Sequence, residues 1–180
     1  MTLEEMKIKV LTLIEEYDEE ADDLTLDTDI ATKLNGVINQ IQNELTRFKK
    51  IPMYKVLSVK EGEEMKLSAI DPQIYQLKTI KDVDYELFDD LVIFGEEGQA
   101  KLFYYKYPET INQDTSDTYT FEITNDLLEI MPYGVAGDLL KSDVSSNYGV
   151  VYYNRYRELL KELDPRYNLG GLSVEGGCDI

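Results

Sequence analysis

The chain has 180 residues, of which 36 are acidic and 18 are basic, so its net charge at pH 7 is -18. This acidic balance argues against a nucleic-acid-binding protein, because phosphates require a basic surface. With no histidine and a single cysteine, Cys178, the chain cannot form an intrachain disulfide, and zinc sites, haem sites and Ser-His or Cys-His catalysis are disfavoured.

Residues 1–52 carry the pattern of two helices. Thr2 and Glu5 have the spacing of a capping box, and Pro52 is expected to end the second helix. Gly36 lies inside that helix, where we expect it to mark a close approach between helices. The apolar faces are Leu3, Met6, Val10, Leu13, Ile14 and Tyr17 in the first helix and Ile30, Leu34, Val37, Ile38, Ile41, Leu45 and Phe48 in the second.

Between residues 53 and 123 the apolar periodicity changes to two, which indicates strands. Because no helix separates these short strands, antiparallel pairing is expected. The clearest predicted hairpin joins Leu91–Phe94 to Ala100–Tyr107 through a turn that contains glycine. The seven expected strands are Tyr54–Val59, Met65–Ala69, Ile74–Thr79, Tyr85–Phe88, Leu91–Phe94, Ala100–Tyr107 and Tyr119–Ile123.

Residues 124–165 predict a second pair of helices. Thr124 or Asn125 can cap the first of them, and Pro132 inside it predicts a kink near Met131 or a helix that restarts there. The second helix carries tyrosines at successive turns, which we interpret as part of a buried stripe. That stripe is Tyr148, Tyr152, Tyr156, Leu159, Leu160 and Leu163.

Residues 166–180 form a glycine-rich tail with scattered apolar residues. Gly170-Gly171 and Gly176-Gly177 bracket a short apolar run that could add as a strand to a neighbouring sheet edge. Disorder is the alternative interpretation. The apolar anchors that make the tail a candidate for docking on another subunit or on a portal are Tyr167, Leu169, Leu172, Val174 and Ile180.

The order of elements predicts an α+β fold. Residues 1–52 and 124–165 are expected to pack as a four-helix bundle-like body, because two separate helix pairs cannot bury their apolar faces alone. Residues 53–123 form an inserted small antiparallel β domain, and residues 166–180 form an extended C-terminal tail. The positions expected to share the core of the body are Ile38, Ile41, Leu45, Leu139, Tyr152 and Leu160.

The last helix also has a side that points away from its tyrosine stripe. Tyr153, Arg155 and Arg157 lie on that side. Because tyrosine and arginine are enriched at protein interfaces, we take these three residues as the candidate subunit contact.

Catalysis and cofactor binding find little support in the sequence. The paired carboxylates, such as Asp89-Asp90 and Glu96-Glu97, lie in expected turns, where they are solvated. The glycine pairs of the tail lack the lysine and the helix of a phosphate-binding loop. We therefore expect a non-enzymatic protein with no catalytic residues, no cofactor and no metal.

The many tyrosines raise the question of base stacking, which needs cations beside the rings. The basic residues that lie near the tyrosine clusters in sequence are few against the acidic field. They are Lys101, Lys106, Arg155 and Arg157. The sequence therefore disfavours base stacking.

The segment MPYGVAGDLLKSDVSSNYGVVYYNRYRELLKELDPR, residues 131–166, resembles the C-terminal helix pair of bacteriophage head-tail connector (adaptor) ring proteins. In that family a helix with a proline near its start leads through a small, acidic segment to a helix with spaced tyrosines and an arginine. The closing glycine-rich tail is also similar. The resemblance is looser over the N-terminal helices and weak over the middle of the chain.

The resemblance implies a viral structural protein at the head-tail interface of a virion, assembled in the bacterial host cytoplasm. It implies a homo-oligomeric ring, usually of twelve copies, that contacts the portal protein and tail or further adaptor proteins and continues the DNA ejection channel. DNA is then passing cargo, and an acidic wall keeps it from binding. No apolar run approaches the roughly 20 residues of a membrane span, so no membrane partner is expected. The alternative is an acidic soluble interaction protein such as a DNA mimic.

Overall fold

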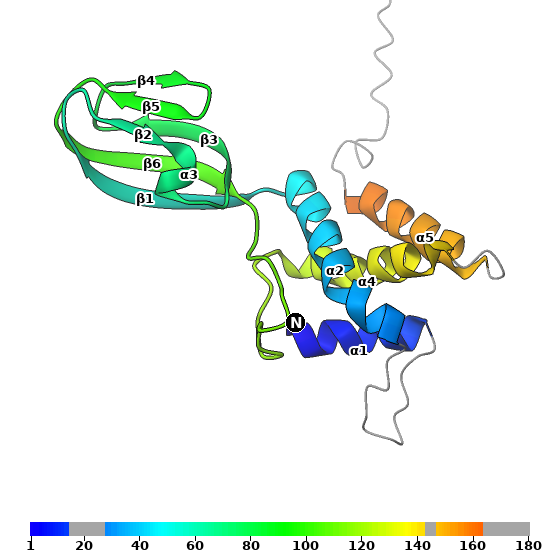
Figure 1. Cartoon of the computed structure of the whole chain (residues 1–180). Coiled ribbons are helices and arrows are strands. Elements are labelled where there is room, and N and C mark those ends of the chain that lie inside the picture. Colours follow the sequence, from blue (N-terminus) through cyan, green and yellow to red (C-terminus); the bar gives the residue numbers. More distant parts are fainter. Residues whose placement is uncertain (15–27, 143–146, 164–180) are drawn as a thin grey trace, which may run out of the picture.

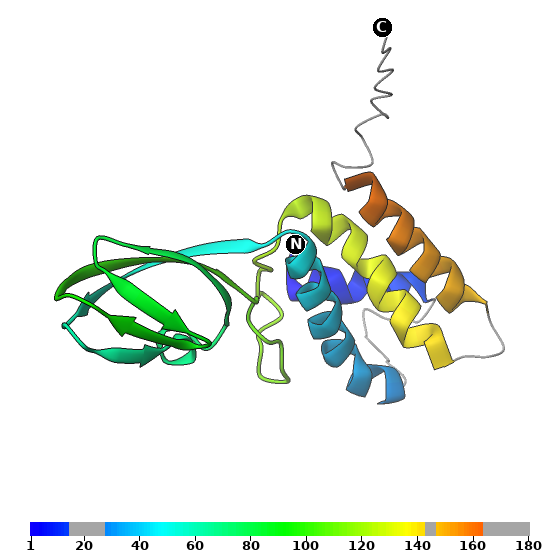
Figure 2. The ribbon, with the colours of Figure 1, turned by 90° about the horizontal axis from the view of Figure 1, so that it is seen from above.

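The structure, a computed structural model, describes residues 1–14, 28–142 and 147–163. Its helices and strands form an α+β protein with two parts, which we term the helical body and the β unit. Figures 1 and 2 show the β unit projecting from the helical body, joined to it by the end of α2 and by the segment that follows β6. The helical body consists of α1 (Leu3–Leu13), α2 (Thr28–Phe48), α4 (Asn125–Leu139), the 3-10 turn η1 (Leu140–Ser142) and α5 (Tyr148–Leu163).

The start of α1 confirms the capping box that the sequence predicts. The backbone N–H of Glu5 donates to the Thr2 hydroxyl oxygen at 3.2 Å, and the backbone N–H of Thr2 donates to the Glu5 carboxylate at 2.9 Å. These two bonds satisfy donors that the first turn of a helix would otherwise leave unpaired. α1 is also held to the segment before α4 by a bridge between Thr2 and Thr120.

The predicted four-helix bundle is wrong, because the helices are arranged around α4. This helix packs against α1, α2 and α5. Figure 1 shows α2 crossing α4 steeply, and Figure 2 shows α1 running obliquely to it. A bundle helix buries one stripe of its surface, whereas α4 buries nine of its 15 residues, including neighbours such as Leu127 and Leu128 or Ile130 and Met131. The apolar residues of α4 thus cover more than one face. α4 also continues through Pro132 as one helix.

Four of the six predicted core positions are confirmed as buried. They are Ile38, Ile41, Leu45 and Leu160. Leu139 and Tyr152 are half-buried, so the expectation of full burial was wrong for them. Tyr152 is amphipathic, and its hydroxyl donates to the carbonyl oxygen of Leu13 at the end of α1.

The tyrosine stripe of α5 is shifted at its start from the predicted one. Tyr156 is fully buried, but Tyr148 is 60% exposed and Gly149 takes the inner position. A Cβ at Gly149 would lie 2.9 Å from the Leu140 carbonyl oxygen, so the helix presents its smallest residue there. Gly36 was expected at a close helix approach, but no described residue outside its own helix lies within 4 Å of its Cβ position, so that prediction was wrong.

The β unit contains two three-stranded antiparallel sheets, in the orders β1-β6-β3 and β2-β5-β4. Inward-facing residues of both sheets, such as Phe94 and Leu102, form a core whose buried residues are distinct from those of the helical body. The elements are β1 (Ile51–Val59), β2 (Glu64–Lys66), the short helix α3 (Leu67–Ile70), β3 (Ile74–Lys81), β4 (Tyr85–Phe88), β5 (Leu91–Phe94) and β6 (Gly98–Lys106).

Three strand predictions are corrected by the structure. The hairpin between Leu91–Phe94 and Ala100–Tyr107 does not form, because β5 pairs with β2 and β4 while β6 pairs with β1 over nine residues. The predicted strand Met65–Ala69 turns into α3 after Lys66. The predicted strand Tyr119–Ile123 is not a strand, because Phe121 and Ile123 bury their side chains in the core of the helical body.

The contacts between the two parts include several polar ones. The Lys106 ammonium is nearly buried and pairs with the Glu122 carboxylate, and it also donates to the Gln73 side-chain oxygen at 3.2 Å. From the end of α2, Lys50 donates to Gln76 at 2.6 Å and Arg47 donates to the Tyr107 hydroxyl at 3.1 Å. These bonds fix the base of the β unit against α2.

Candidate subunit interface

The first two turns of α5 expose apolar side chains that none of the described residues covers. Tyr148 is 60% exposed, Val150 61%, Val151 56% and Tyr153 44%. Scattered exposed apolar residues are ordinary in proteins, but several of them on one short stretch of helix, on more than one of its sides, favour an interaction site. We term these four residues the α5 surface.

The α5 surface is exposed because α5 packs on α4 through its inner side. That contact is very close. A Cβ at Gly137 would lie 2.8 Å from the backbone nitrogen of Tyr153, and one at Gly134 would lie 3.0 Å from the Tyr156 ring. The two glycines of α4 therefore let the backbone of α5 and the Tyr156 ring approach the α4 backbone. This contact occupies the inner side of α5 and leaves its other sides to solvent.

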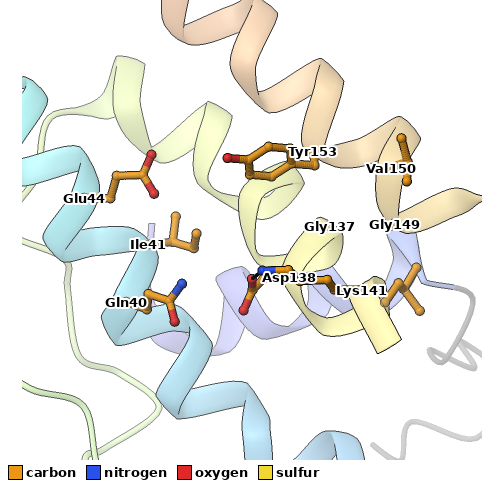
Figure 3. A pocket seen from close by; sticks show the side chains of 10 residues that line it. Gln40, Ile41, Glu44, Gly137, Asp138, Lys141, Gly149, Val150 and Tyr153 are labelled. Atoms are coloured by element: carbon orange, nitrogen blue, oxygen red, sulfur yellow. Dashed lines mark ion pairs between the residues drawn. The ribbon is translucent and has the colours of Figure 1, made fainter. Parts of the chain in front are cut away.

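A pocket of about 460 Å³ adjoins the α5 surface, between α2, α4 and α5. Figure 3 shows the Tyr153 ring along one side of the pocket and Glu44 and Ile41 of α2 on the other. Ile41 and the two small residues Gly137 and Gly149 contribute apolar lining. The remaining lining residues are Gln40, Asp138, Leu140, Lys141 and Val150.

The charges around the pocket are mixed but predominantly negative. Glu44 and Asp138 contribute carboxylates, and Asp138 forms an ion pair with Lys141 at 3.5 Å. Beside the pocket, Tyr156 has a buried hydroxyl that finds no hydrogen-bond partner of good geometry in the described part of the chain. Burial, together with the Glu44 carboxylate, raises the pKa of Tyr156 far above its ordinary value, so this tyrosine stays neutral.

The residues predicted at the subunit contact fall on two sides of α5. Tyr153 lines the pocket, and Arg157 follows it one turn later on the same side. Arg155 follows Val151 by one turn on the other side, where it forms an exposed ion pair with Glu158 at 3.6 Å. All three are exposed. The tail candidates Tyr167, Leu169, Leu172, Val174 and Ile180 lie outside the described residues.

Sequence reasoning missed the pocket and three residues of the α5 surface. Tyr148 was assigned to the core, and Val150 and Val151 were not considered. A signal was present in the segment Gly149–Tyr153, where four consecutive apolar side chains cannot all lie on the inner face of one helix. No sequence pattern predicts the pocket, because its walls come from three separate helices, α2, α4 and α5.

Within residues 1–14, 28–142 and 147–163, no group of His, Cys, Asp and Glu side chains is placed to hold a metal ion. None of the helices in those ranges is long and apolar enough to cross a membrane.

No protein-family model matches the chain, and no curated protein matches it with significant similarity. The function is therefore argued from the surfaces of the molecule.

Proposed function

We propose that this protein is a non-enzymatic structural protein of a tailed bacteriophage, an adaptor ring subunit between the portal and the tail. It would act in the virion after assembly in the host cytoplasm, with the portal, tail proteins and neighbouring copies as partners. The observation that carries the proposal is the α5 surface, which lies within the segment that resembles the connector family.

The composition of the α5 surface supports a protein partner. It consists of two tyrosines and two valines, of which Val150 and Tyr153 line the pocket. Arg155 and Arg157 follow them in α5. Tyrosine and arginine dominate the binding energy of protein interfaces when they become desolvated. In a ring, the α5 surface of one copy would contact its neighbour.

The net charge of -18 supports a DNA passage but opposes assembly. Like charges repel across a subunit contact, so the contact must gain its stability from apolar burial rather than from electrostatic attraction. The α5 surface, with four apolar side chains, is suited to that role. Raising the salt concentration should therefore favour assembly by screening the repulsion.

Size-exclusion chromatography with light scattering tests the proposal on the full chain, alone and with a candidate portal protein. We expect a mass of many copies in at least one arm, and loss of that species in Val151→Asp and Tyr153→Ala. Leu87→Asp is the matched control, because Leu87 is 48% exposed on β4, away from the α5 surface. A monomer or dimer in both arms would contradict the ring and favour the DNA-mimic alternative.

A further inference from the structure

The outer face of the sheet β1-β6-β3 carries aromatic rings and cations. Residues of β6 alternate, so that Ala100, Leu102 and Tyr104 are buried in the core of the β unit. Lys101, Phe103 and Tyr105 consequently point to the opposite side. The register places Tyr54 of β1 beside Phe103 and Lys81 of β3 beside Lys101. We term the residues on this side of the sheet the outer sheet face. They are Tyr54, Lys81, Lys101, Phe103 and Tyr105, with Arg47, Lys50, Tyr75 and Tyr107 at the base of the face.

The rings of the outer sheet face form two adjoining groups. The ring centroids of Tyr54 and Phe103 are 5.0 Å apart. The ring of Tyr75 lies 6.5 Å from Tyr105 and 4.6 Å from Tyr107. Phe103 and Tyr105 are two residues apart on the same strand, which places them about 7 Å apart. The two groups thus form one aromatic strip along β6.

A cation lies over three of these rings. The Lys50 ammonium is 4.7 Å from the centroid of Tyr105, the Lys81 ammonium is 5.4 Å from that of Phe103, and the Arg47 guanidinium is 5.6 Å from that of Tyr107. A cation can take this position only where the face of a ring, rather than its edge, is accessible from the solvent side. The strip therefore presents flat ring faces, each covered by a long side chain that can move aside.

The local charge of the outer sheet face is opposite to that of the whole chain. Of the outward positions paired in the described strands, none holds Asp or Glu. Those positions are Pro52, Tyr54, Val56, Ser58, Gln76, Thr79, Lys81, Gln99, Lys101, Phe103 and Tyr105. Asp82 contacts the edge of the face, where it pairs with Lys101 at 2.6 Å. Residues 51–106 carry seven lysines against eleven acids, a net charge of -4, which leaves -14 for the rest of the chain.

We infer that the outer sheet face binds single-stranded nucleic acid, a property beyond the adaptor function and independent of ring formation. Bases stack on Tyr54, Phe103 and Tyr105, and Lys50 and Lys81, displaced from the rings, pair with the phosphates. Stacking on protein aromatics beside cations is how proteins bind single strands without sequence preference. A duplex keeps its base faces covered, and an acidic peptide has no flat groups for the rings, so single strands fit this face best.

The affinity should be modest and dependent on salt. The acids of the helical body repel a polyanion, although screening limits their reach to about 10 Å at 0.1 M salt. Each lysine that pairs with a phosphate contributes about 0.7 to the slope of log affinity against log salt for single strands. Binding should therefore be measured first at low salt.

Fluorescence anisotropy of a labelled oligothymidylate of about 20 nucleotides tests the inference on the full chain. We expect binding that Tyr54→Ala and Phe103→Ala each weaken about tenfold, because each removes one stacking platform. Lys50→Ala and Lys81→Ala should each weaken binding and reduce its salt slope. Tyr54 is 50% exposed, so its substitution leaves the fold intact even where Phe103→Ala perturbs it.

Matched controls on the helical body separate this face from general charge effects. Tyr153→Ala removes an exposed aromatic residue and Lys141→Ala an exposed lysine, and both should leave binding unchanged. Tyr54→Trp should retain it. The inference is overturned if the oligothymidylate does not bind, or if the matching duplex or poly-glutamate binds as well. Binding that is unaffected by Tyr54→Ala and Phe103→Ala would equally overturn it.

Discussion

The helical body and the β unit each bury an apolar core, but they expose different kinds of side chains. The body packs α1, α2 and α5 around α4 and exposes tyrosine and valine on α5. The β unit packs two small sheets and exposes rings beneath lysines and an arginine. The two clusters of buried residues in the described chain share no member. Substitutions on the surface of one part should therefore leave the core of the other undisturbed.

The largest expected effects come from truncation of one core at a time. Leu45→Ala in the helical body and Leu102→Ala in the β unit each remove a fully buried side chain, so each should lower the free energy of unfolding by about 2–5 kcal/mol. Urea denaturation with hydrogen exchange measures both the size and the location of the effect. We expect increased exchange mainly in the part that carries the substitution. Equal destabilisation of both parts by either variant would show that they unfold as one unit.

Two glycines of the helical body differ in how closely another helix approaches them. Gly137→Ala places a Cβ 2.8 Å from the backbone of Tyr153, so we expect a loss of about 1–3 kcal/mol as α5 is pushed from α4. Gly36→Ala meets nothing within 4 Å and should gain about 1 kcal/mol from helix propensity. Thermal denaturation of both variants measures the contrast. Equal effects of the two substitutions would contradict the close α4–α5 contact.

Two tyrosines, buried Tyr104 in the β unit and partly buried Tyr119 at the helical body, should differ in how much their hydroxyl groups contribute to stability. The Tyr104 hydroxyl in the β unit donates to Asp71 at 2.8 Å, whereas the buried Tyr119 hydroxyl has no hydrogen-bond partner among the described residues. Tyr104→Phe should therefore cost about 1–3 kcal/mol at neutral pH, and Tyr119→Phe should be nearly neutral. Urea denaturation measures both, and a clear loss in Tyr119→Phe would contradict the assignment.

The same tyrosines predict a fall in stability at alkaline pH. Burial is the main reason that the pKa of Tyr104 and that of Tyr119 rise to about 12, from an ordinary value of 10.0. Above pH 10 the unfolded chain loses these protons while the folded chain keeps them until about pH 12, so the free energy of unfolding falls across that interval. Tyr119→Phe should make this fall less steep, which denaturation at a series of alkaline pH values measures. An unchanged slope would contradict the pKa shift.

Local features of the fold could be predicted from the sequence, and pairings between distant segments could not. The capping box of Thr2 and Glu5 depends on four consecutive residues and was correct. The partners of β5 depend on β2 and β4, so the expected hairpin with β6 was wrong. The bundle was wrong because α4 buries residues on more than one face and packs against three helices, which follows from contacts between distant segments.

The outer sheet face shows the same limit at a functional surface. Lys101 and Lys106 are close to the tyrosines of β6 in sequence, but Lys106 points inward and pairs with Glu122. The cations that cover the rings include Lys50 and Lys81, which are far from those rings in sequence. Only the pairing of the strands brings these lysines beside the rings. Base stacking was therefore disfavoured from sequence for want of the right cations.

Hydroxyl-radical footprinting with mass spectrometry tests most directly whether the two parts serve different partners, because it reports the solvent exposure of aromatic side chains. We expect that assembly with neighbouring copies or portal protein protects Tyr148 and Tyr153 on α5 and leaves Tyr54 on β1 exposed. Addition of oligothymidylate should protect Tyr54 and Phe103 and leave Tyr153 unchanged. Protection of Tyr54 on assembly, or of Tyr153 by the oligonucleotide, would contradict the division of surfaces.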